Sequence, residues 1–169
     1  MILYGLIGFP LSHSFSEDYF RNKFEKENLR GKQYQLFPIP DLSRFHFLVK
    51  NNPCLQGLNV TIPFKEKIIP FLDELDDKAS VIGAVNTIKI TRKKNFVCMK
   101  GYNTDADGFR LSDCFEGHQD ALILGTGGAA KAVAYSFSIS GLTPPIAERN
   151  HLTSRSFEEP QSCDFATMP

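Results

Sequence analysis

Tryptophan is absent from this sequence, cysteine is rare, and neither sign of charge is in excess. The four cysteines form no CxxC pair and their spacings fit no zinc site, so we expect free thiols in a reducing cytoplasm. Nineteen basic residues balance nineteen acidic ones, which argues against nucleic acid or an anionic membrane as a partner. No apolar stretch approaches the roughly 20 residues that span a bilayer, and the N-terminus lacks the basic region of a signal peptide. The four histidines show no ligand spacing, so no metal site is expected.

Length and composition indicate a globular protein of one domain, or of one domain and part of another. The chain has 169 residues, of which 42% are hydrophobic and 22% are charged, close to the globular average. A cytoplasmic protein that binds a small molecule fits these figures, because a small anionic ligand needs only a few local donors.

The first part of the chain alternates predicted strands with predicted helices. Residues 2–8, 34–37 and 55–62 are short apolar runs that end at glycine or proline, as buried strands do. Ser14 with Glu17 three positions later forms a capping box, and Asp41 can cap a second helix that reaches about residue 50. Strand, helix, strand, helix, strand predicts a mostly parallel sheet covered by helices.

The rest of the chain predicts a hairpin and a second strand–helix unit. Helical patterns cover residues 64–82 with a break at Pro70, and β-rich runs at 84–91 and 95–99 flank a basic cluster at 92–94. That cluster suits a solvated hairpin tip better than a phosphate site. A helix is expected from Asp105 or Asp107 to about residue 115. A strand at 121–124, a helix at 129–138 and a strand at 143–147 follow, and the tail from about residue 150 shows no periodicity.

Two segments place polar side chains where predicted strands end. Ser12, Ser14 and Ser16 stand at a strand-to-helix turn, where hydroxyls and free amides can bind a carboxylate or phosphate, or can merely cap the helix. Residues 59–65 read NVTIPFK at the end of the third strand. Asn59 and Thr61 alternate with apolar neighbours and share one face. Lys65 follows a proline and is either an acid–base group in a cleft or an exposed lysine.

A glycine-rich turn points to a nucleotide. Residues 122–132 read LILGTGGAAKA, which is a strand, a tight turn and a helix in the order that binds a dinucleotide pyrophosphate. About 20 residues further on, such sites place an acidic residue against the ribose of NAD or an arginine against the 2′-phosphate of NADP. Glu148 and Arg149 both stand there, so the residues alone leave the choice of cofactor open.

Together these segments resemble shikimate dehydrogenases. Residues 8–16 (GFPLSHSFS) look like the family's carboxylate-binding loop, and residues 59–65 are similar to its Asn-Val-Thr-x-Pro-x-Lys signature. Residues 83–87 (GAVNT), 101–108 (GYNTDADG) and 125–129 (GTGGA) look like its later signatures, in the same order. The resemblance covers about residues 1–140.

The resemblance implies a fold, a reaction and a set of site residues. The fold would be α/β, with a three-layer substrate-binding domain at 1–104 and a truncated Rossmann-like NAD(P)-binding domain at 105–169. The reaction would be the reversible NADPH-dependent reduction of 3-dehydroshikimate to shikimate, in aromatic amino-acid biosynthesis. Lys65 and Asp105 would be catalytic. The substrate would contact Ser14, Ser16, Asn59, Thr61, Asn86 and Asp105. The cofactor would contact Gly125, Thr126, Gly127, Gly128, Ala129 and Arg149.

Two departures from the family pattern leave alternatives open. The family has a neutral residue before the arginine where this chain has Glu148, so NADP(H) is expected and NAD(H) stays an alternative. Too few residues follow Asp105 for a six-stranded nucleotide domain. An inactive truncated or frameshifted fragment that keeps the substrate-binding domain is therefore one alternative, and a quinate/shikimate dehydrogenase-like paralogue is another. The chain could be a monomer or a homodimer.

Overall fold

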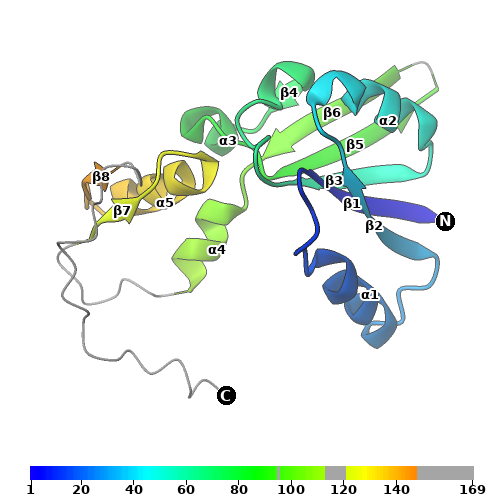
Figure 1. Cartoon of the computed structure of the whole chain (residues 1–169), viewed down its shortest axis with the longest axis horizontal. Helices are drawn as coiled ribbons and strands as arrows, with labels where there is room; N and C mark the ends of the chain where they lie inside the picture. The colour runs from blue at the N-terminus through cyan, green and yellow to red at the C-terminus, as the bar shows by residue number, and fades with distance from the viewer. Residues whose placement is uncertain (95, 113–120, 148–169) are drawn as a thin grey trace.

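A computed structural model of the protein describes residues 1–94, 96–112 and 121–147. Figure 1 shows a six-stranded sheet with helices on both faces, and a smaller unit around α5 (Gly128–Ile139) beyond one end of the sheet. The fold class is therefore α/β, as the sequence predicts. In the described ranges, no helix combines the length and the apolar character needed to cross a bilayer.

The six-stranded sheet is mostly parallel. Its order across the sheet is β2 (Lys32–Pro38), β1 (Ile2–Gly8), β3 (Leu55–Val60), β5 (Thr87–Lys93), β6 (Phe96–Tyr102) and β4 (Glu74–Leu75). β1 pairs in parallel with β2 and β3, and β4 pairs in parallel with β6, whereas the β5–β6 hairpin and its contact with β3 are antiparallel. The carboxyl ends of β1 and β3 therefore meet at one edge of the sheet, where ligands bind in such folds.

Helices cover the two faces of the sheet unequally. α2 (Phe45–Asn51) and α3 (Asp77–Ile82) lie on one face, over the main core, which includes the fully buried Ile7, Phe45, Leu55, Ile68 and Ile88. α1 (Ser16–Lys26) lies on the other face, where Phe20 and Phe24 pack against Leu6, Leu11 and Tyr34 of a smaller cluster. The result is the three-layer arrangement expected for the first domain.

The start of α1 differs from the expected capping box. Phe15 occupies the N-cap position without a side-chain hydrogen bond, and the Ser14 Oγ accepts from the Ser16 amide at 3.3 Å. Phe15 and Tyr19 are 85% and 60% exposed. The side of α1 that packs on the sheet thus presents Phe20 and Phe24, while Phe15 and Tyr19 face away from it.

The helix predicted over residues 64–82 is wrong for most of its length. The segment instead contains a 3-10 turn, η2 (Ile69–Phe71), then β4 and α3. The Asp73 carboxylate accepts from the Met99 amide at 2.7 Å, and the Asp73 amide donates to the Met99 carbonyl at 3.0 Å. These bonds hold the following residues along β6. Asp76 then caps α3 by accepting from the Ala79 amide at 3.0 Å.

The helix predicted after Asp41 and the predicted hairpin are confirmed in outline. Asp41 caps a 3-10 turn, η1 (Leu42–Arg44), by accepting from the Ser43 amide, and α2 follows directly. The hairpin pairs Lys93 with Phe96. Arg92 donates to the carbonyls of Val49 and Asn52 at 2.8 and 3.0 Å, so this member of the basic cluster ties the hairpin to the end of α2.

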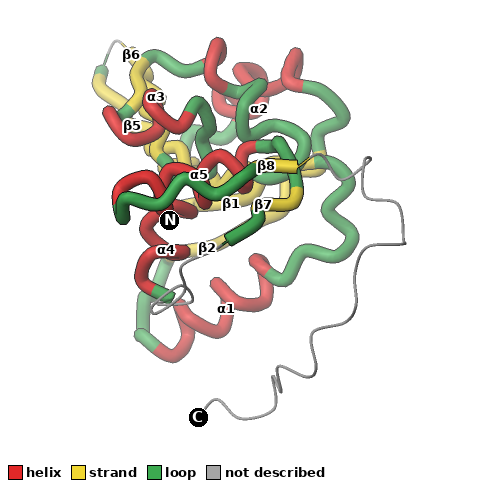
Figure 2. Tube along the Cα trace, turned by 90° about the vertical axis from the view of Figure 1, so that its left-hand side faces the viewer, coloured by secondary structure: helices red, strands yellow, loops and turns green. Residues whose placement is uncertain are grey.

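The smaller unit contains the predicted strand, glycine turn, helix and strand. β7 (Ile123–Leu124) pairs in parallel with β8 (Ile146–Ala147), and α5 connects them, as Figure 2 shows. α4 (Asp105–Leu111) packs on α5, where the Ser136 Oγ donates to the Ala106 carbonyl at 3.0 Å. The last residues of the predicted 105–115 helix, together with Glu148, Arg149 and the predicted irregular tail, lie outside the described residues.

Candidate active site

Lys65 and Asp105, the pair that the resemblance makes catalytic, form a salt bridge. The Lys65 Nζ lies 2.7 Å from the Asp105 Oδ2. Lys65 belongs to the segment after β3, and Asp105 is the first residue of α4, so two elements 40 positions apart meet here. Their side chains are 18% and 33% exposed, which leaves both groups open to a ligand while solvent screening is reduced.

Asn86 holds the second oxygen of the same carboxylate. The Asn86 Nδ2 donates to the Asp105 Oδ1 at 2.6 Å, and the Asn86 Oδ1 accepts from the Thr104 amide at 2.8 Å. Asn86 is itself buried. With one carboxylate oxygen on Lys65 and the other on Asn86, the Asp105 side chain is fixed in direction. The three residues therefore form one preorganised group.

A continuous row of polar side chains extends from this group toward α1. The Thr104 Oγ1 lies 3.4 Å from the Thr87 Oγ1, and the Asn59 Nδ2 donates to the Thr87 Oγ1 at 3.4 Å. The Tyr34 hydroxyl donates to the Asn59 Oδ1 at 2.8 Å, and the Ser16 side chain bonds to Tyr34. We call this set the polar row; its members are Ser16, Tyr34, Asn59, Thr87, Thr104, Asn86, Asp105 and Lys65.

Three members of the polar row are absent from the predicted site. Thr87 and Thr104 each follow an asparagine in the segments 83–87 and 101–108. Their position within these family signatures could have marked them as site residues. Tyr34 has no such neighbour. Its position in a short β-rich run reads as core, and only the pairing of β2 with β1 brings its hydroxyl to Asn59.

Ser14 and Thr61 stand beside the polar row. The Ser14 Oγ accepts from the backbone of Ser16, which orders the loop between β1 and α1. Thr61 lies against the end of β1, since a Cβ on Gly8 would stand 2.4 Å from the Thr61 Cγ2. A glycine at position 8 thus lets the ends of β1 and β3 approach each other.

The glycine-rich turn lies next to Lys65. A cavity of about 420 Å³ separates the segment after β3 from the turn after β7. It is lined by Thr61, Lys65, Gly125, Gly127, Gly128 and Ala129, among others. Thr126 is exposed in the same turn. Gly125 has a φ of 125°, a conformation that favours glycine. The amides at the start of α5 open onto this cavity, which suits an anionic group such as a pyrophosphate.

Two ion pairs join the smaller unit to the sheet. Lys131 of α5 bonds to Glu66, the neighbour of Lys65, and Lys78 of α3 bonds to Asp107 of α4. Both pairs are partly exposed, so each adds little stability alone. They nevertheless flank the Lys65–Asp105 pair and hold α4 and α5 beside it.

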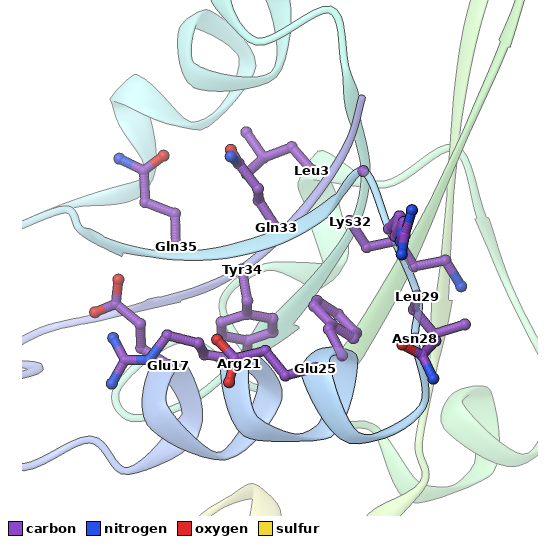
Figure 3. A pocket seen from close by; sticks show the side chains of 13 residues that line it. Leu3, Glu17, Arg21, Glu25, Asn28, Leu29, Lys32, Gln33, Tyr34 and Gln35 are labelled. Carbon is purple, nitrogen blue, oxygen red and sulfur yellow. The ribbon is translucent and has the colours of Figure 1, made fainter.

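A larger cavity, of about 710 Å³, lies away from this chemistry. It opens between α1 and the outer strand β2, and Figure 3 shows acidic and basic side chains together on its walls. Tyr34 of the polar row lines this cavity, but Lys65, Asp105 and Asn86 do not, so the cavity beside Lys65 is the better candidate for catalysis. Within the described ranges, no group of three or more metal-ligating side chains occurs.

Comparison with known proteins identifies the family. Residues 6–88 match the model of the shikimate dehydrogenase substrate binding domain. A shikimate dehydrogenase (NADP(+)) of Carboxydothermus hydrogenoformans is 42% identical over 159 residues, which cover 87% of this chain and 52% of that protein. The chain belongs to the shikimate dehydrogenase family. It spans about half the length of the curated relatives it matches.

Solved structures of shikimate dehydrogenases show the same fold. The Thermus thermophilus enzyme in complex with shikimate has a TM-score of 0.76 and 31% identity, over 88% of this chain and 57% of that one. The same enzyme in complex with NADP(H) and shikimate has a TM-score of 0.72 and 29% identity, over 88% and 56%. The fold and family predicted from the sequence are thereby confirmed.

Proposed function

We propose that this chain carries the substrate-binding and catalytic part of a shikimate dehydrogenase, which interconverts 3-dehydroshikimate and shikimate with NADP(H). The observation that carries this proposal is the Lys65–Asp105 salt bridge, which lies between the polar row and the cavity under the glycine turn. Residues 1–104 form the substrate domain, and residues 105–169 belong to the nucleotide domain. The packing of α4 on α5 supports this boundary.

The polar row and its neighbours match the chemistry of a polyhydroxylated carboxylate. Ser14 and Ser16 bind the carboxylate, while Asn59, Thr61, Asn86 and Asp105 bind the ring hydroxyls. Side-chain amides and hydroxyls both donate and accept hydrogen bonds, so each ring hydroxyl can find an acceptor for its proton and a donor to its oxygen. A ligand that lacks one hydroxyl leaves a polar group unpaired, and this discriminates strongly against it.

The glycine-rich turn after β7 fits a dinucleotide. A Cβ on Gly128 would stand 2.8 Å from the Lys65 Cβ, so the turn and the catalytic lysine are as close as a bare backbone allows. Gly125, Thr126, Gly127, Gly128 and Ala129 would hold the pyrophosphate at the N-terminus of α5, and Arg149 the 2′-phosphate. The bound nicotinamide would supply or accept the hydride. NAD(H) is the alternative because of Glu148.

Lys65 and Asp105 then perform the proton chemistry. When a hydride reaches the ketone carbon, negative charge develops on the oxygen, and the Lys65 ammonium stabilises that charge and donates the proton. Asp105 accepts a hydrogen bond from the substrate and keeps the ammonium in place, while Asn86 fixes the orientation of its carboxylate. In the oxidative direction the proton returns to Lys65.

A cofactor-dependent absorbance assay tests this proposal. The chain is incubated with shikimate and NADP(+), and reduction is followed at 340 nm, with NAD(+) and quinate in parallel. Turnover that disappears in Lys65→Ala supports the proposal. Well-folded protein that binds shikimate without turnover favours a binding fragment, and protein that neither binds nor turns over shikimate contradicts the proposal.

A further inference from the structure

Tyr34 occupies a fixed position between α1 and the polar row. Its ring stacks on Phe20, with centroids 4.3 Å apart and an interplanar angle of 14°. Figure 3 shows the side chain directed from β2 toward α1. Only 9% of the residue is exposed. Packing therefore determines where its hydroxyl lies, independently of any ligand.

The Tyr34 hydroxyl bonds to two residues that serve different ends of the proposed substrate. It donates to the Asn59 Oδ1 at 2.8 Å, and the side chain of Ser16, the first residue of α1, hydrogen-bonds to it. Burial raises the pKa of the Tyr34 phenol to about 12, and the hydrogen bond with Ser16 acts in the opposite direction. The phenol is therefore protonated at neutral pH and can act as a permanent donor to Asn59.

The donor on Tyr34 determines which end of the Asn59 amide is free. With its oxygen engaged by Tyr34, the amide directs its nitrogen along the polar row toward Thr87, at 3.4 Å. A rotation by 180° would exchange donor and acceptor at the position where a ring hydroxyl is expected. Without the Tyr34 hydroxyl, the Asn59 oxygen loses this donor, and the remaining bond to Thr87 is long at 3.4 Å.

We propose that Tyr34 is a positioning residue for the substrate, which sets the direction of the Asn59 amide and links it to Ser16. This inference rests on the proposed function, since it assigns Asn59 to a ring hydroxyl and Ser16 to the carboxylate. Recognition of the two ends of the substrate then depends on one buried hydroxyl, which bonds to both Asn59 and Ser16.

The test is a double-mutant cycle on shikimate affinity. Tyr34→Phe, Asn59→Ala and the double variant are titrated with shikimate by calorimetry. Tyr34→Phe weakens binding roughly tenfold, as the loss of one oriented hydrogen bond predicts. In the Asn59→Ala background, the same change has little further effect, because the group it orients is absent. Independent, additive losses would overturn the proposal, as would an affinity within about twofold of wild type for Tyr34→Phe.

A ligand-free readout separates this proposal from the proposed function. The side-chain amide resonances of Asn59 are recorded in unliganded wild type and Tyr34→Phe, and the proposal expects them to shift or broaden in the variant. Unchanged resonances contradict it whatever shikimate does, while a wild-type chain that binds no shikimate rejects both proposals. Tyr4→Phe is the matched control. Tyr4 faces Tyr34 in the β1–β2 register, and its hydroxyl bonds to none of the residues that the structure describes.

Discussion

Gly128 lies so close to Lys65 that a Cβ on the glycine would stand 2.8 Å from the Lys65 Cβ and 3.1 Å from the Ala84 Cβ. The two residues come from the start of α5 and from the segment after β3, 63 positions earlier in the chain. Their contact joins the proposed cofactor turn to the proposed catalytic lysine. The fit at this point leaves no room for any side chain larger than hydrogen.

Gly128→Ala should therefore impair catalysis by displacing Lys65. The Lys65 Cβ is close to the backbone and cannot swing away, so the segment that carries it must move by several tenths of an ångström. We expect turnover to fall roughly tenfold or more, since small misplacements of catalytic groups are costly. Shikimate affinity should change far less. Steady-state kinetics and calorimetry measure the two quantities.

Gly108→Ala is the matched control for this substitution. Gly108 lies in α4, and a Cβ there meets no other atom within 4 Å. Alanine favours the helix by about 0.5–1 kcal/mol over glycine, so the variant should melt at the same or a higher temperature. Equal activities for the two variants would refute the argument from close approach.

Lys65→Ala should abolish turnover and keep part of the shikimate binding. Removal of a general acid costs about 100-fold to 10,000-fold in rate, whereas the asparagines and serines of the site remain. Lys67→Ala provides a control, because Lys67 is exposed two positions further on. A Lys65→Ala variant that retains more than about a tenth of the wild-type rate would rule out the proposed role of Lys65.

Stability at high pH should depend on Tyr34. Burial raises the pKa of this phenol from its ordinary value of 10.0 to about 12 in the folded protein. The neutral phenol therefore contributes stability below about pH 10, and this contribution is lost as the pH rises from about 10 to 12. Denaturant unfolding across this range should show that the free energy of unfolding falls with rising pH in wild type, and that it falls less in Tyr34→Phe. Identical pH profiles would contradict the assignment.

The choice of cofactor should depend on Glu148. A carboxylate beside Arg149, the proposed ligand of the 2′-phosphate, would repel that group, so Glu148→Ser should raise the ratio of the NADP(+) rate to the NAD(+) rate. Measurement of kcat/KM with both cofactors tests this expectation. An unchanged ratio would show that Glu148 points away from the ribose.

Local chemistry explains which parts of this account could be predicted from the sequence. The strands of the sheet and the glycine turn follow from short apolar runs and their terminators, which are properties of neighbouring residues. The helix expected over 64–82 was wrong because Asp73 bonds to the backbone of Met99, a tertiary contact that periodicity does not encode. The role of Tyr34 is not predictable from the sequence for the same reason, since its hydroxyl reaches Asn59 only when β2 pairs with β1. Only the resemblance to shikimate dehydrogenases predicts that Lys65 and Asp105 act together, because no local pattern links residues 40 positions apart.

A calorimetric titration of shikimate into the wild-type chain and Asn86→Ala tests whether the group around Lys65 and Asp105 binds the proposed substrate, because Asn86 holds both Asp105 and the Thr104 backbone. We expect saturable binding at one site in wild type, weakened at least about tenfold by the substitution. Absence of saturable binding in folded wild-type protein, or equal affinity in the two proteins, would contradict it.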